Sequence, residues 1–197
     1  ASLGIVLTYT TSGIFNFAYG GVAMFCAYSF WRLRDRWGLS QWFSIPLVVL
    51  VLAPFLGLLL EAIFRPLAVA AAEVQIVVAL GMLSFFVTLV PRIFGESDHS
   101  LPTIFSHSSF RMAGTVVTWN EAGTFLVALL LAGAVYVLLR RTRLGTATRA
   151  VVDNRELAGL IAVNAGTVGQ MAWIISTVFA AISGILLSTQ EGLVVYV

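Results

Sequence analysis

Long uncharged apolar segments constrain this chain more than any other feature. Four of them, residues 43–60, 75–90, 122–139 and 168–187, approach the roughly 20 apolar residues that a bilayer-crossing helix needs. Charged residues make up only 10% of the chain, against about 25% in soluble proteins. The pattern therefore predicts an all-α fold, a polytopic transmembrane helical bundle in which each helix satisfies its own backbone hydrogen bonds.

The first 31 residues carry no charge, yet their pattern does not predict one straight transmembrane helix. Threonines, glycines and Asn16 interrupt the apolar pattern halfway along. We expect one helix to end near Tyr9, a broken or re-entrant polar segment to run through Gly20, and a second helix to extend from about Gly21 to Trp31.

Prolines and small residues predict details of the other spans. Pro46 and Pro54 predict a kink in the span at 43–60, and the span at 75–90 is expected to stop at Pro91. Pairs of small residues four apart occur at Ala53/Gly57 and Ala180/Gly184. Such pairs allow close contact between membrane helices.

Arginine distribution predicts the orientation. Residues 140–156 hold five of the eleven arginines, so this loop is the best candidate for the cytoplasmic side. Alternation then places residues 61–73 inside and the loops at 32–41 and 92–121 outside. The arginines at 32, 34 and 36 depart from the positive-inside bias. Residues 92–121 are expected to form an aqueous loop containing a hairpin or a short helix.

The composition also excludes several functions. Lysine is absent, so neither a P-loop nor imine chemistry can reside in these residues, and any ATP hydrolysis must come from another chain. Cys26 lies in an apolar stretch and reads as a packing residue. His99 and His107 fit no metal-ligand spacing, and the basic residues do not cluster in a soluble module. We expect no catalytic residues, no metal, no cofactor in this chain and no nucleic-acid partner.

Residues 140–164 form the most informative segment. We interpret them as the end of a span, a glycine break at Gly145, and a short amphipathic helix whose apolar face includes Leu157 and Ile161 while Arg149 and Arg155 reach solvent. Two roles remain open for this helix. It could rest on lipid headgroups, or it could dock into a groove on a cytoplasmic partner.

This segment resembles the permeases of ATP-binding-cassette (ABC) importers for branched-chain amino acids and the related urea and amide importers. The family pattern is R-R-T-x-L-G-x-A-x-R-A followed by D-x-E-A-A-x-x-x-G-I-D. The matching residues are Arg140, Arg141, Thr142, Leu144, Gly145, Ala147, Arg149, Ala150, Glu156 and Ala158. The chain departs from the pattern at Leu157, at Ala162 in place of Gly, at Val163 in place of Ile and at Asn164 in place of the final Asp.

Two further segments resemble the same family. Residues 13–20, Gly-Ile-Phe-Asn-Phe-Ala-Tyr-Gly, are similar to G-x-x-N-F-A-H-G, with Tyr19 in place of His, and Ala27-Tyr28 fits the G-A-Y that follows. Residues 61–67 resemble E-R-x-x-Y-R-P-L. Three segments in the expected order cover most of the chain.

The resemblance implies a permease that pairs with a second permease subunit, two cytoplasmic ABC ATPases that bind ATP-Mg, an extracytoplasmic substrate-binding protein and the membrane lipid. It implies a multi-pass protein of the bacterial cytoplasmic membrane that imports branched-chain or related amino acids by alternating access. Asn16, Tyr19 and Gly20 would then lie near the translocation path, unless they form only a buried helix break. The ATPase-coupling loop, about residues 140–164, would include the following residues: Arg143, Gly145, Arg149, Glu156, Ala158 and Ala162.

Two other classes of membrane protein are alternatives to an importer permease. A secondary transporter or channel for a small polar solute would normally carry ionisable residues within its spans, and an intramembrane hydrolase would need a His or similar group there. The spans here have almost none. We expect one membrane domain over residues 1–197, cut from a longer subunit at both ends.

Overall fold

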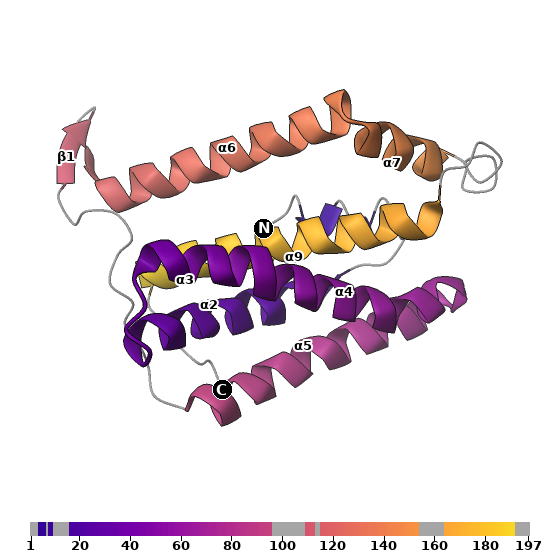
Figure 1. Cartoon of the computed structure of the whole chain (residues 1–197), viewed down its shortest axis with the longest axis horizontal. Helices are drawn as coiled ribbons and strands as arrows, with labels where there is room; N and C mark the ends of the chain where they lie inside the picture. The colour runs from indigo at the N-terminus through magenta and orange to yellow at the C-terminus, as the bar shows by residue number, and fades with distance from the viewer. Residues whose placement is uncertain are drawn as a thin grey trace.

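The computed structural model describes residues 4–6, 8–9, 16–95, 109–112, 115–153 and 164–191. Four stretches in this part of the chain are helices long and apolar enough to cross a membrane: Gln41–Ala68, Ala72–Phe94, Trp119–Arg141 and Gly166–Thr189. The helices lie side by side along one axis (Figure 1). The predicted polytopic helical bundle is confirmed, and each predicted uncharged segment lies within one of these helices.

The second helix begins slightly earlier than predicted. Residues 4–6 and 8–9 are helical, residues 16–18 form a turn, and α2 extends over Tyr19–Asp35. The second helix therefore begins two residues before Gly21 and continues four beyond Trp31. Arg32 and Arg34 occupy its last turn, where positive charge is favourable next to the C-terminal carbonyl groups. Residues 10–15 lie outside the described part.

The second span consists of four consecutive helical pieces. These are α3 (Gln41–Leu47), the π-helical η1 (Val48–Leu52), α4 (Ala53–Phe64) and the 3-10 helix η2 (Arg65–Val69). Pro54 lies two residues after the end of the π-helical turn and has no N–H to donate to the carbonyl of Leu50. The wider turn at η1 relieves this mismatch, so the predicted irregularity lies just before Pro54.

Pro91 does not end the third span, contrary to the prediction. Helix α5 (Ala72–Phe94) continues through Pro91 and stops at Gly95, whose φ of 96° is favourable mainly for glycine. The Gly95 N–H donates to the Pro91 carbonyl at 2.8 Å. At the other end of α5, the Gln75 side chain donates to the carbonyls of Leu67 and Ala70 and closes the turn that follows η2.

A β-hairpin precedes the fourth span, within the loop for which a hairpin or short helix was expected. Strands β1 (Ser109–Met112) and β2 (Thr115–Thr118) pair antiparallel, with Ser109 opposite Thr118. Helix α6 (Trp119–Arg141) then begins with a capping box, in which the Thr118 hydroxyl accepts from the Glu121 N–H and the Glu121 carboxylate accepts from the Thr118 N–H.

Helix α9 (Ala165–Glu191) forms the centre of the bundle and packs against α2 and α4, while α5 packs on the far side of α2. Both predicted small-residue pairs mark these contacts. A Cβ on Gly184 would lie 2.3 Å from the Ala23 carbonyl oxygen of α2, and one on Gly57 would lie 2.6 Å from Thr177 Oγ1 of α9. Because glycine has no Cβ, the backbones can approach this closely.

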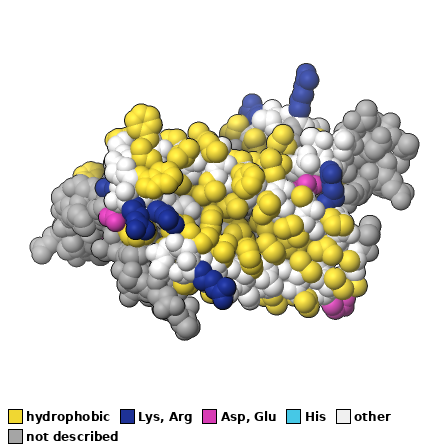
Figure 2. Space-filling model, turned by 60° about the horizontal axis from the view of Figure 1, so that its bottom comes forward, with side chains coloured by type: hydrophobic (Ala, Val, Ile, Leu, Met, Phe, Trp, Pro, Cys, Tyr) yellow, Lys and Arg dark blue, Asp and Glu magenta, His cyan; other side chains and the backbone are white. Residues whose placement is uncertain are grey.

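The two segments predicted to be cytoplasmic lie at the same end of the bundle. The turn between η2 and α5 lies near the start of α9 and helix α7 (Arg143–Asp153), whereas the end of α2, the start of α3 and the hairpin lie at the other end (Figure 1). Figure 2 shows a face on which hydrophobic side chains form a broad field with charged side chains mainly at its margins. This distribution suits a membrane-embedded surface.

Candidate functional site

Three buried polar side chains lie at about half the depth of the bundle. Asn16, Tyr19 and Ser176 are at most 5% exposed. The Asn16 amide atoms and the Ser176 hydroxyl have no hydrogen-bond partner among the described residues. Buried polar atoms without partners are costly, so they usually mark a water, a ligand or a functional contact. These three residues, called the polar cluster below, are therefore the candidate site.

The N-terminal helical residues, the start of α2 and the middle of α9 surround or carry the polar cluster. A Cβ on Gly4 would lie 2.7 Å from the Tyr19 ring and 3.1 Å from Ser176 Oγ, which places the N-terminal helical residues between α2 and α9. Ser176 lies 11 residues into a helix of 27, at the middle of α9. The Asn16 carbonyl accepts the Tyr19 N–H at 3.2 Å and thereby starts α2. A helix that starts at this depth places its break inside the bundle, as the sequence predicted.

The third predicted path residue lies apart from this cluster. Gly20 is exposed, and the nearest side-chain atom to a Cβ on it would be Leu83 Cδ1 of α5 at 3.8 Å. The structure thus places the Tyr19 ring and the Ser176 hydroxyl around Gly4, whereas Gly20 faces α5. Sequence reasoning missed Ser176, although its seven-residue spacing from Ser183 indicates one polar stripe on α9.

The helix break in the described part of the loop at residues 140–164 does not lie at Gly145, where it was predicted. The break occurs at Thr142, whose hydroxyl accepts from the Gly145 N–H at 3.2 Å and donates to the Leu138 carbonyl. Gly145 lies inside α7, and a Cβ there would lie 2.2 Å from the Leu139 carbonyl oxygen. The glycine is therefore required by the tight contact between α6 and α7 rather than as a helix break.

Helix α7 has an inner and an outer face. Val151 is buried against Val168 of α9, with Ala147 and Ala150 packed around them. Arg143 and Arg149 lie on the exposed side. The inner face packs α7 against α9, while two guanidinium groups are exposed on the outer face. Glu156, Ala158 and Ala162, the other predicted coupling residues, lie outside the described part.

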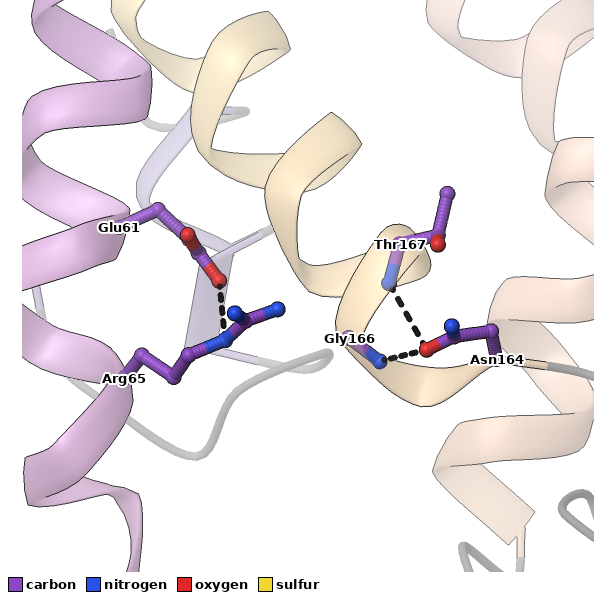
Figure 3. Close-up of polar contacts among 5 residues, drawn as sticks. All are labelled: Glu61, Arg65, Asn164, Gly166 and Thr167. Atoms are coloured by element: carbon purple, nitrogen blue, oxygen red, sulfur yellow. Dashed lines mark hydrogen bonds and ion pairs between the residues drawn. The ribbon is translucent and has the colours of Figure 1, made fainter.

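An ion pair within the family-like segment at residues 61–67 lies beside the start of α9 (Figure 3). The Glu61 carboxylate, with its side chain 9% exposed, contacts Arg65 Nε at 3.1 Å, while the Arg65 side chain is 58% exposed. A Cβ on Gly166 would lie 2.9 Å from Arg65 Nη2. The guanidinium group therefore lies directly against the first turn of α9.

Asn164 takes the position at which the related pattern has Asp, and the structure gives the reason that both residues fit. Its Oδ1 accepts from the Gly166 N–H at 2.9 Å and from the Thr167 N–H at 3.3 Å (Figure 3). Asn and Asp are about equally good at this capping task. The replacement thus preserves the start of α9.

Comparison with known proteins identifies the family. A family model described as the permease component of branched-chain amino acid transport systems matches residues 1–196. The chain belongs to this family. Together with the four candidate spans, membership makes it part of a multi-pass transport permease of the cytoplasmic membrane.

Individual family members are moderately similar to this chain in sequence. The probable branched-chain amino acid transport permease protein LivH of Methanocaldococcus jannaschii is 29% identical over 98% of this chain and 62% of its own length. The high-affinity branched-chain amino acid transport system permease proteins BraD of Pseudomonas aeruginosa and LivH of Escherichia coli K12 are 25% and 26% identical, over 98% of this chain and 67% of theirs. The chain thus spans about two thirds of the length of these relatives. No solved structure matches it.

Proposed function

We propose that the chain is the main part of a permease subunit of an ABC importer, which moves branched-chain or related amino acids by alternating access. ATP would be hydrolysed, with Mg²⁺, on two separate ATPase subunits, since this chain has no lysine for a P-loop. A second permease subunit would complete the path, and an extracytoplasmic binding protein would deliver the solute.

The observation that carries this proposal is the continuous packing from the outer face of α7 to the buried polar cluster. Arg143 and Arg149 are exposed on α7, whose inner face is fixed to α9 through Val151 and Val168. Helix α9 then runs as one piece to Ser176. A movement imposed on α7 by an ATPase would therefore be transmitted along a rigid helix to the polar cluster.

The chemistry of the cluster supports an amino-acid solute. Hydroxyl and amide groups, such as those of Asn16, Tyr19 and Ser176, can pair with a zwitterionic backbone. No ionisable carboxylate or amine is among them, and a weak, uncharged site allows release as well as binding. The surrounding residues are apolar and suit an aliphatic side chain.

ATP-dependent uptake by the purified complex would test the proposal. The full-length subunit with its co-purified partners is reconstituted in liposomes, with binding protein and radiolabelled leucine outside and ATP-Mg supplied to the ATPase side. We expect uptake only with ATP. Uptake that persists without ATP or an ATPase would instead support a secondary transporter or channel.

Arg149→Glu tests the docking face. Reversing an exposed charge on α7 is expected to reduce recovery of the ATPase with the permease by roughly tenfold, since a charged hydrogen bond contributes about 1.5–3 kcal/mol. Arg92→Glu, an equally exposed change at the opposite end of the bundle, is the control. Equal ATPase recovery with both variants would remove α7 from the interface.

A further inference from the structure

The arginines at the end of α2 need a physical explanation, because they lie at the end of the bundle opposite the Arg-rich loop. Arg32 Nη1 donates to the Ile93 carbonyl at 3.0 Å, and the guanidinium carbon lies 5.5 Å from the centre of the Phe94 ring. A guanidinium has five N–H donors, so Arg32 is held in place while most of its donors remain for another acceptor. Arg36 follows one helical turn later and is exposed.

An apolar groove begins beside Arg32. Its volume is about 440 Å³, within the range of roughly 300–1,000 Å³ that is typical of ligand pockets. It lies between the end of α2, the segment from α3 to α4, and the end of α5. The following residues line it: Ser29, Arg32, Leu33, Trp37, Leu47, Val48, Val51, Leu52, Phe55 and Phe94.

Apolar side chains form most of the wall of the groove. Val48 forms its buried floor, while the side chains of Val51 and Phe55 on the rim are 59% and 60% exposed. Ser29 uses its hydroxyl to donate to the Phe25 carbonyl at 2.8 Å. Arg32 is therefore the one charged side chain among the lining residues, and it lies at one end of an otherwise apolar groove.

The groove is long enough to hold part of a lipid chain. Leu47 and Phe55 are eight residues apart, about 12 Å along a helix at 1.5 Å per residue. This length approaches half of a hydrocarbon core about 30 Å thick. Trp37, 68% exposed, lies at the mouth, where tryptophan is favoured at the level of the headgroups. The π-helical turn η1 supplies much of the wall, and such turns are frequent at functional sites.

We propose that this groove binds one acyl chain of an anionic phospholipid, whose phosphate is held by Arg32 and Arg36. A ligand with a long apolar chain and an anionic head matches an apolar groove that ends at a guanidinium group. The lipid also explains why arginines persist on the side of the membrane where the positive-inside bias disfavours them. This inference does not rest on the proposed transport function, because the lipid is expected to bind without solute or ATP.

Native mass spectrometry of the purified full-length subunit, titrated with palmitoyl-oleoyl phosphatidylglycerol, tests the proposal. We expect tighter binding than of phosphatidylcholine with the same chains. Arg32→Gln should weaken phosphatidylglycerol binding by roughly tenfold or more, through loss of a charge-assisted hydrogen bond. Val51→Trp should weaken both lipids by filling the groove. Two variants at exposed positions outside the groove, Arg92→Gln and Val77→Trp, serve as matched controls and should bind like the unmodified subunit.

Equal binding of the two lipids, or equal loss with the control variants, would overturn the proposal. A crosslink locates the occupant independently. Val51→Cys carries a benzophenone-maleimide, and Cys26 leaves little background because it is fully buried. In the assembled complex we expect a photo-crosslink to phospholipid. A crosslink to a second permease subunit would instead make the groove a protein interface and reject the lipid site.

Discussion

Glu61 and Arg65 form an asymmetric pair, because the carboxylate is buried and the guanidinium is more than half exposed. The exposed partner can be solvated by water when it is alone, whereas a buried carboxylate that loses its partner keeps its desolvation cost. The energetic consequence of breaking the pair therefore depends on which partner is removed. The location of the pair next to Gly166 makes this asymmetry relevant to the movement of α9.

We predict that Arg65→Met destabilises the subunit more than Glu61→Gln does. Loss of the guanidinium should cost about 1–3 kcal/mol, the usual penalty for an unsatisfied buried polar group. Thermal unfolding in detergent measures the stability of the two single variants and of the double variant. The double variant should lose less than the sum of the single losses, because the two residues are in contact. Equal losses for the single variants would show that Glu61 is not desolvated.

Asn164 offers a second residue-scale test. Asn164→Asp should retain the stability of the subunit, because the carboxylate can accept the same two backbone N–H groups. Asn164→Ala should cost about 1 kcal/mol through loss of the cap. A loss of similar size with Asp would mean that capping is not what position 164 contributes. The measurement is again the unfolding midpoint in detergent.

At the scale of elements, α9 connects the two halves of the candidate site. It runs antiparallel to α4, with the Phe64 and Trp173 rings stacked 5.1 Å apart, and it approaches α2 closely at Gly184. Helix α7 packs on its first turns through Val168. Tight contacts over much of its length allow α9 to move only together with its neighbours.

Gly184→Ala is expected to destabilise the bundle by about 1–3 kcal/mol, because the new methyl group would overlap the Ala23 carbonyl and force the helices apart. Gly133→Ala on α6 is the matched control. A Cβ there has nothing within 4 Å, so the variant should be neutral or more stable by up to about 1 kcal/mol. Thermal unfolding of both variants would reveal the contrast, and equal stability would refute the close contact.

For the whole molecule, the arrangement of the helices assigns each loop to one of two ends. Asn164 and Gly166 lie next to Arg65, and Arg32 lies next to Ile93, so each end is fixed by side-chain contacts. Helix α6 packs mainly against α7 and β2 among the described elements, and Leu129 and Leu130 are about 60% exposed on it. Such a surface suits lipid or another subunit.

Thiol labelling of membrane vesicles can determine which end faces the cytoplasm. Glu73→Cys and Arg149→Cys should react with an impermeant maleimide only in inside-out vesicles, and Ser40→Cys and Gly95→Cys only in right-side-out vesicles. All four positions are exposed, and Cys26 is buried. Labelling of Glu73→Cys and Arg149→Cys from opposite sides would contradict the fold.

The amino-acid sequence was sufficient for the spans, the family and the small-residue contacts. Uncharged segments of bilayer length leave few alternatives to membrane helices, and the spacing of Gly57 and Gly184 from Ala53 and Ala180 indicates close approach without any coordinates. Helix ends were predicted less well. Pro91 and Gly145 were interpreted from local propensity as helix ends, but each lies within a helix.

The sequence by itself determined that this chain lies in a membrane, because transfer of uncharged apolar segments into lipid depends on composition and length alone. It also determined the family, through local patterns that need no fold. Only the tertiary structure decided which polar groups meet. The Ser176 hydroxyl lies close to the Tyr19 ring across Gly4, and Arg32 lies in the groove lined by Val51 and Phe55. Helices distant in sequence pack side by side there, and local propensity carries no information about that packing.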